Sequence, residues 1–214
     1  MDISQRKLQE HSIVLIGDFN PAIFQPLWLA SVELISKSDA EAAEIDIISK
    51  KAAIFTVGEI RIEVLQTRFQ AQTIREDHFE TLRDLVVGIF GLLNFTPITQ
   101  IGINIAMHFL LDSEDKWHEV GHTLAPKKIW EGVLNNPGMT DLSMIEDKRR
   151  DGYKGRIMVM VQPSVRYNPG LYFFINDHFE AEGNRDIITI LEKNWKISID
   201  RSREIISKLL TGLL

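Results

Sequence analysis

The sequence predicts an α+β fold: a mainly antiparallel sheet with helices packed on one face. Three observations lead to this prediction. Segments with the two-residue alternation of β-strands follow one another in runs, and each run ends in a segment with the three- and four-residue spacing of an amphipathic helix. Runs of strands followed by helices are typical of antiparallel sheets that helices cover on one side. The length of 214 residues suffices for one large domain, which we place over residues 1–214.

The first part of the predicted order runs over residues 11–95. Residues 12–17 form a short apolar run typical of a buried strand, and proline suits the first turn of a helix over residues 26–36. A polar connection over residues 38–44 leads into a β region over residues 44–74. The clearest helix follows, and its apolar residues recur at helical spacing: Phe79, Leu82, Val86, Ile89 and Leu93.

The second part of the order is expected over residues 98–214. A long strand over residues 98–111 alternates isoleucines with small or polar residues, and a helical turn over residues 117–122 follows. Pro126 either stops this segment or starts a helix that carries Ile129, Trp130 and Val133. Three strands and a final helix complete the order, over residues 140–146, 156–162, 171–177 and 186–213. The final helix is expected to bury one broken apolar stripe: Ile188, Leu191, Trp195, Ile199, Ile206, Leu209 and Leu213.

The same order of elements therefore occurs twice along the chain. This repetition predicts two pseudo-repeated βα-β-meander-α halves, residues 11–95 and 98–214, which are related by element order and not by residue identity. The alternative is one irregular α+β domain whose halves match by chance.

Composition bounds the function classes. There are 24 Lys and Arg against 30 Asp and Glu, and the net charge of −6 argues against a nonspecific nucleic-acid binder, which usually has a basic surplus. The absence of cysteine excludes disulfides, cysteine-ligated zinc and cysteine nucleophiles. Residues 1–7 lack the apolar region of a signal peptide, and no apolar run approaches the ~20 residues of a membrane span. We therefore expect a cytoplasmic protein with no membrane contact.

One basic cluster stands out, made of Lys148, Arg149, Arg150 and Lys154. Such a run is typical of a solvated hairpin tip, and the alternative is a contact surface for phosphate or for an acidic partner. Arg149 and Arg150 are therefore candidate interaction residues.

The segment His118-Glu119-Val120-Gly121-His122 matches the His-Glu-x-x-His pattern of zinc peptidases. Histidines four residues apart lie on one face of a helix, where both imidazoles can reach one Zn²⁺. Glu119 between them can act as general base on the metal-bound water. One hypothesis is therefore a zinc-dependent metallohydrolase with His118 and His122 as ligands.

The context of this motif favours the alternative, which is two partly exposed histidines at a helix end with no metal. The approach over residues 112–117 is polar, whereas a zinc-binding helix is generally buried, and Pro126 would end the helix close to His122. A catalytic zinc needs three protein ligands, and no third one stands in a recognisable motif. A second pair, Asp177 and His178, has the residue types of an acid/base pair but no further support. The sequence leaves the catalytic residues unidentified, with Glu119 as the alternative, and we expect no cofactor, with zinc as the alternative.

A resemblance extends over residues 98–130, and the following residues carry it: Thr99-Gln100-Ile101-Gly102-Ile103-Asn104, Trp117, Gly121, Leu124-Ala125-Pro126-Lys127 and Trp130. With these residues the region resembles a sporadically distributed bacterial family of uncharacterised proteins. The resemblance implies a small cytoplasmic bacterial protein with no assigned chemistry. By analogy with such families it also implies a part in a bacterial defence or toxin–antitoxin-like system.

The sequence thus predicts a non-enzymatic protein that binds or assembles with another macromolecule. The partner is expected to be another protein, a second copy of the chain included. The grounds are the missing catalytic set, the ordinary charge, and large apolar residues near helix ends. Trp117 and Trp130 join Arg149 and Arg150 as candidate interaction residues.

Overall fold

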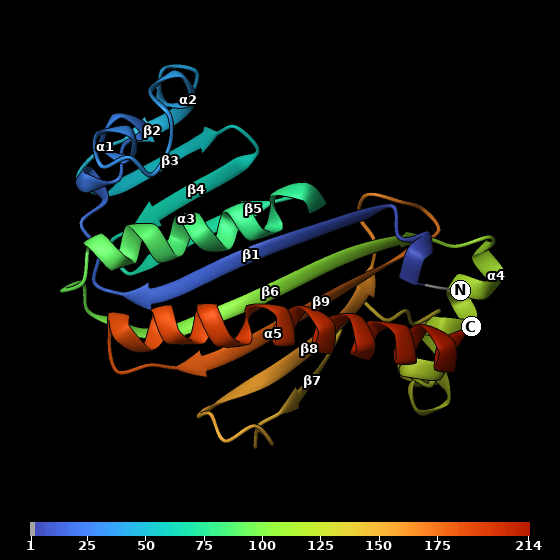
Figure 1. Ribbon diagram of the computed structural model, residues 1–214. Helices are drawn as coiled ribbons and strands as arrows, with labels where there is room; N and C mark the ends of the chain where they lie inside the picture. Colours follow the sequence, from blue (N-terminus) through green and yellow to red (C-terminus); the bar gives the residue numbers. More distant parts are fainter. Residues whose placement is uncertain (1–2) are drawn as a thin grey trace.

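A computed structural model describes residues 3–214, so the first two residues of the N-terminal segment considered above lie outside it (Figure 1). The fold is α+β, as predicted, and a nine-stranded sheet runs in the order β2-β3-β4-β5-β1-β6-β9-β8-β7. Every neighbouring pair in it is antiparallel. The strands are β1 (Leu8–Gly17), β2 (Glu44–Ile48), β3 (Ala52–Val57), β4 (Ile60–Leu65), β5 (Arg68–Thr73), β6 (Ile98–Leu110), β7 (Leu142–Glu146), β8 (Gly155–Pro163) and β9 (Gly170–Glu180).

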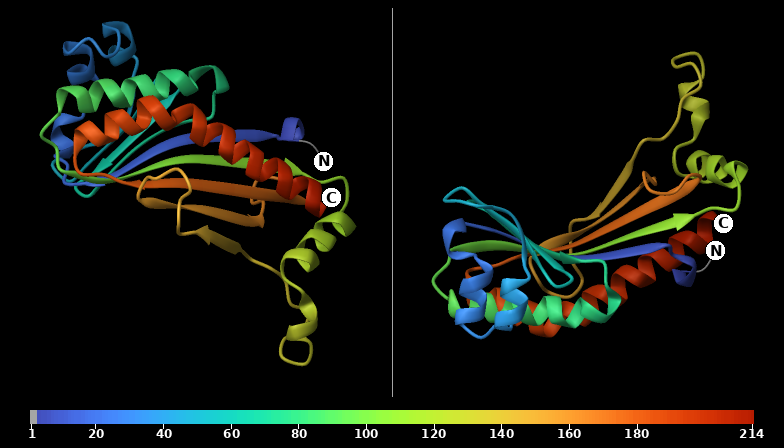
Figure 2. Two further views of the ribbon diagram at one scale, coloured as in Figure 1. Left: turned by 60° about the horizontal axis from the view of Figure 1, so that its bottom comes forward. Right: turned by 90° about the horizontal axis from the view of Figure 1, so that it is seen from above.

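Two helices, α3 (Phe79–Leu92) and α5 (Asn184–Leu213), lie side by side across one face of this sheet (Figures 1 and 2). The short helices α1 (Pro26–Ser31) and α2 (Lys37–Glu41) lie on the same face, beside the β2–β4 wing (Figure 2). In contrast, α4 (Glu114–Leu124) lies beyond the end of the central strands. The buried apolar residues form one cluster between the sheet and the helices. No helix in the described part of the chain is long and apolar enough to cross a membrane.

The buried stripe of α5 differs from the predicted one. Ile188, Leu209 and Leu213 are only half-buried, and polar side chains take places in the buried face instead. Three of these lie one helical turn apart: Asn194, Ser198 and Ser202. A search for apolar periodicity does not count buried serine and asparagine. The apolar stripe is therefore interrupted in the sequence, although the buried face of α5 is continuous.

The predicted alternation of β6 is confirmed. Its isoleucines face α5, and the opposite face carries polar side chains that hydrogen-bond across the central strands. Asn176 Nδ2 donates to Asn104 Oδ1 at 2.5 Å, and Asn104 Nδ2 donates to Ser12 Oγ at 3.2 Å. Gly102 leaves room for this network, because a Cβ atom there would lie 2.6 Å from Asn176 Nδ2.

The helix expected over residues 26–36 is shorter than predicted. It ends at Ser31, and Glu33 has a positive φ of 61°, which α-helix does not allow. Ser36 then caps α2 by accepting a hydrogen bond from the Asp39 amide at 3.0 Å. The polar connection predicted over residues 38–44 therefore contains most of a helix.

Candidate functional site

The His-Glu-x-x-His motif lies on α4, so its predicted helical setting is confirmed. Ser113 caps the helix by accepting a hydrogen bond from the Lys116 amide at 3.3 Å. His118, Glu119 and His122 are all exposed, and the two imidazole ring centroids lie 6.4 Å apart. Both rings lie on one helix face, at the outside of the molecule.

No third ligand joins these two histidines. Among residues 3–214 there is no group of three or more His, Cys, Asp or Glu side chains placed to hold a metal ion. Asp112 is engaged by Lys116 at 2.8 Å, and His108 Nδ1 is hydrogen-bonded to Ser164 Oγ at 2.8 Å. Zn²⁺ at this site would have two protein ligands from the described residues, and a catalytic zinc needs three.

The segment that joins β6 to β7, residues 112–141, projects from the sheet on the side opposite α3 and α5 (Figure 2). We call this segment the arm. Its base is anchored: Val120 is fully buried, and Trp117 Nε1 donates to the Gly170 carbonyl at 3.1 Å. The base therefore holds the rest of the arm in a defined place.

Of the two alternatives at Pro126, the structure bears out the first: α4 ends at Leu124, and no α-helix follows among the described residues of the outer arm. Only a single 3₁₀ turn forms, η4 (Lys127–Trp130), and the chain then passes through residues with positive φ at Gly132 (80°) and Asn136 (54°). A short helix needs an apolar stripe packed against a core, and the outer arm has no core to pack on. The predicted stripe is consequently exposed: 75% for Ile129, 44% for Trp130 and 70% for Val133.

Two cavities lie next to each other on the arm and share a wall. The shared wall is built from Lys127, Pro137, Gly138 and Met139. Trp117 and His118 line the first cavity, of about 190 Å³, and Trp130 and Leu134 line the second, of about 280 Å³. The chain folds back over residues 135–138 and so creates this wall. Sequence reasoning named Lys127 only within the resemblance and did not single out Met139, because no spacing pattern relates them to either tryptophan.

The lining of these cavities is suited to binding apolar groups. Their walls are mostly apolar and aromatic, and their polar lining residues are Lys127, His118, Asn136, Thr140 and Asp141. In the second cavity the Thr140 hydroxyl donates to the Asp141 carboxylate at 3.5 Å, which is longer than the roughly 2.6–3.2 Å expected between a nucleophile and its base. The arrangement fits apolar side chains of a partner, with Lys127 available to a carbonyl or carboxylate.

The other two candidate residues, Arg149 and Arg150, have different environments. The sequence placed both on a solvated tip, but the Arg149 side chain is fully buried. Its guanidinium lies 3.8 Å from the Phe179 ring centroid and donates to Asp177, to Asp151 and to the His178 carbonyl. Arg150 is exposed and contacts Glu146 at 3.7 Å.

Arg201 of α5 completes this charged cluster. It donates to Asp177 Oδ2 and to Asp151 Oδ2, both at 2.9 Å, so two arginines share two aspartates. Partial burial by itself would raise the pKa of Asp151, but the hydrogen bonds and charges of the arginines outweigh it and lower the pKa to about 2. The cluster holds the β7–β8 loop against β9 and α5, and its role is therefore structural.

Asp177 and His178 do not form an acid/base pair. They are consecutive on β9, so their side chains point to opposite faces of the sheet. Asp177 is buried on the helical face with the arginines, and His178 lies opposite Gly102 and Arg156 on the other face.

In comparisons with known proteins, no family model matches the chain and no curated protein matches it.

Proposed function

We propose that the protein is a non-enzymatic binding protein and that the arm docks another protein. The observation that carries this proposal is the outer arm. Within six residues it exposes four large apolar side chains, Ile129, Trp130, Val133 and Leu134, and two of them, Trp130 and Leu134, line the second cavity.

Physical reasons favour docking over a neutral surface. A contiguous exposed apolar patch costs free energy in water and is typical of a protein–protein contact. Aromatic residues beside a pocket are the usual anchors of such contacts, and Trp130 is in that position. Trp117 and Val120 already fix the base of the arm in the free protein. Binding therefore loses less conformational entropy there than it would with an unanchored segment.

The test compares three forms of the protein as immobilised bait. In Leu134→Asp a charge replaces an apolar wall of the second cavity. Phe95→Ser is the matched control, because Phe95 is 94% exposed, apolar, and lies between α3 and β6, outside the arm. We expect the wild type and Phe95→Ser to retain the same protein from cell extract, and Leu134→Asp to lose it. Equal retention by all three forms would contradict docking through the arm.

The competing hypothesis is the zinc-dependent metallohydrolase. It requires stoichiometric zinc in protein purified at neutral pH without chelator, and loss of that zinc in His118→Ala. It also requires that Glu119→Gln abolish hydrolysis while the metal stays bound. Elemental analysis that finds one zinc per chain would overturn the non-enzymatic proposal.

We also propose that the halves over residues 11–95 and 98–214 are a duplication. The sheet order supports it, because β1 and β6 are central neighbours and each is flanked by the last strand of its own half, β5 and β9. Each half then ends in a helix on the same face, α3 or α5. The defence or toxin–antitoxin-like role rests on the sequence resemblance alone.

A further inference from the structure

We propose that β7 pairs with β7 of a second copy of this chain, antiparallel and about a two-fold axis, so that one sheet continues through a dimer. This goes beyond the proposed function, because the surface is the edge of the sheet and not the arm. The argument rests on the contrast between the two sheet edges, on strand number, and on the symmetry of the pairing.

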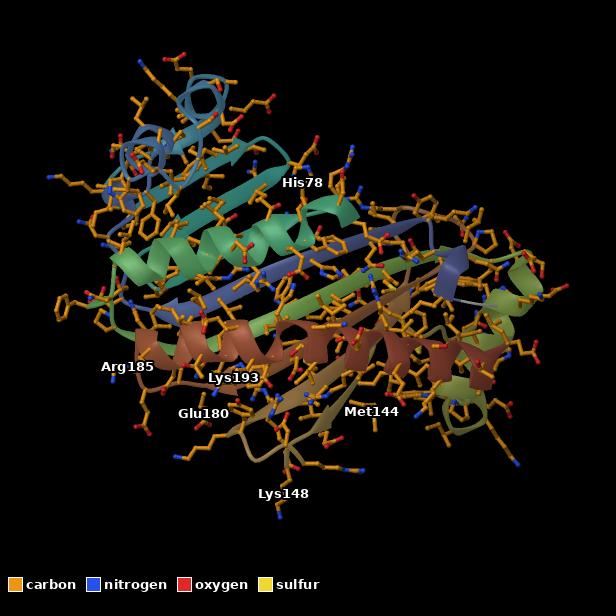
Figure 3. The ribbon with its side chains drawn as sticks, in the orientation of Figure 1. His78, Met144, Lys148, Glu180, Arg185 and Lys193 are labelled. Carbon is orange, nitrogen blue, oxygen red and sulfur yellow. The ribbon has the colours of Figure 1, made fainter. Side chains whose placement is uncertain are left out.

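The β7 edge is open and regular. β7 pairs with β8 over five consecutive residues without a register shift. Its residues Ser143 to Glu146 are all exposed, and Met144 and Ile145 keep 63% and 55% of their surface in solvent. Figure 3 shows Met144 at this margin of the sheet. A regular edge strand with exposed apolar residues is a template for another strand.

The β2 edge at the other end of the sheet is protected by irregularity and charge, although Ile45 and Ile47 are 55% and 44% exposed there. Its pairing with β3 shifts register between Ile45 and Ile47, so the edge is irregular there. Within that irregularity Asp46 accepts a hydrogen bond from Arg61 at 2.7 Å. Bulges and charges on an edge strand are the devices that prevent further pairing.

Under the duplication proposed above, on which this step rests, the second half has one strand fewer than the first. Counting outward from the β1–β6 centre, one side has β5, β4, β3 and β2, and the other has β9, β8 and β7. The position next to β7 corresponds to the one that β2 fills next to β3. An antiparallel strand fits there, since β2 is antiparallel to β3.

A second β7 fits this position best. Centred on Met144, antiparallel pairing uses all five residues, with Met144 opposite its own copy and Ser143 opposite Ile145. The single charge within the strand, Glu146, then faces Leu142 and no other charge. Outside the strand, Asp141 falls opposite Asp147 of the other copy, so one like-charge pair lies at each end of the pairing, with Lys148 next to it in the sequence. Lys148 extends away from the sheet in Figure 3.

Symmetry limits this assembly to two copies. A two-fold contact uses the same surface on both chains and is closed once formed. The outer margins of the joined sheet are then two protected β2 edges, which cannot continue the pairing. One open edge and one protected edge in each chain therefore predict a dimer and not a fibre.

Single cysteines test the pairing directly, because the chain has no cysteine of its own. Opposed residues in an antiparallel pair have Cα atoms about 4.5 or 5.5 Å apart, within the roughly 4.4–6.8 Å that a disulfide spans. We expect Met144→Cys to form an intermolecular disulfide under mild oxidation at micromolar protein. Two matched controls should not: Ile145→Cys, whose copy would lie diagonally beyond disulfide reach, and Ile47→Cys on the β2 edge. Preferential crosslinking of Ile145→Cys would overturn the register, and crosslinking of Met144→Cys no faster than Ile47→Cys would overturn the interface.

Sedimentation equilibrium of the wild type supplies a second measurement. We expect a dimer that weakens about tenfold or more in Met144→Lys, which sets two ammonium groups opposite each other, and that is unchanged in Ile47→Lys. A wild type that stays monomeric at all concentrations overturns the inference. The arm variant Leu134→Asp should remain dimeric, so failure of arm docking and failure of β7 pairing are separate results.

Discussion

On the helical face of β9 the molecule buries charged side chains, and on the arm it exposes large apolar ones. Both regions reverse the usual distribution, but only one of them is compensated within the chain. Asp177 and Arg149 have fully buried side chains, and each is hydrogen-bonded to oppositely charged partners. Ile129, Val133 and Leu134 have no comparable packing partners.

This difference indicates a structural part for the charged cluster and, under the proposed function, a binding part for the arm. Buried charges are tolerated where every one is paired and hydrogen-bonded. Pairing within the chain therefore explains the arginine–aspartate cluster, which holds parts of the fold together. An exposed apolar run contributes little to the stability of the monomer and is typical of contact surfaces, which agrees with the proposed docking of a partner. If this holds, substitutions in the arginine–aspartate cluster change the stability of the fold, and substitutions on the outer arm change binding alone.

The largest expected effect is in Asp177→Asn. The amide keeps the volume but removes one of the two carboxylates that neutralise Arg149 and Arg201. We expect the free energy of unfolding to fall by about 3 kcal/mol in chemical denaturation, because a buried charge is left under-compensated. Glu180→Gln, an exposed change on the same strand, should stay within about 0.5 kcal/mol. A loss in Asp177→Asn as small as in this control would remove the structural side of the comparison.

The next effect concerns His11, which is fully buried and stacked on Phe79 with ring centroids 3.4 Å apart. Burial, together with the charges of Arg203 and Arg6, lowers the pKa of His11 from 6.5 to about 3. Between these values the unfolded chain binds a proton that the folded chain does not. The stability of the fold therefore falls as pH drops below 6.5, with a slope that approaches ~1.4 kcal/mol per pH unit until pH nears 3.

His11→Gln isolates this contribution, because it removes the titrating ring. Denaturation of both forms between pH 7 and pH 4 should give curves that converge as the pH falls, since only the wild type loses this contribution. Parallel curves would show that the buried imidazole does not couple to folding.

The smallest expected effect on stability is on the arm. Leu134→Asp and Trp130→Ala should change the free energy of unfolding by no more than about 0.5 kcal/mol, because exposed side chains contribute little to folding. The same variants should lose the arm partner. A stability loss above 1 kcal/mol would mean that the outer arm packs on the rest of the chain, and the comparison would fail.

The strands were the most predictable part of the fold. Alternating residues identify β6, and helical spacing identifies α3, since both patterns arise from burial of one face. The buried side of α5 was harder to predict because Asn194, Ser198 and Ser202 are polar yet lie in it. At Pro126 the sequence left the end of one helix and the start of another as alternatives, because spacing alone does not show whether a core is present.

The candidate site was predictable in its residue types and not in its arrangement. Trp117 and Trp130 line the two cavities, as expected of contact residues, but the cavities exist because the chain folds back through Pro137 and Met139. Arg149 could not be told from Arg150 by sequence, because the pairing with Asp177 joins residues that lie 28 positions apart.

The sequence by itself determined the α+β class, the order of the elements, the helical setting of the His118–His122 motif and the absence of cysteine chemistry. These follow from local periodicity and composition, which need no knowledge of distant residues. Only the tertiary structure decided that no third ligand among the described residues joins the motif, that Arg149 is buried, and that one sheet edge is open. Each of these depends on which remote segments the sheet brings together, and neighbouring residues in the chain do not encode that.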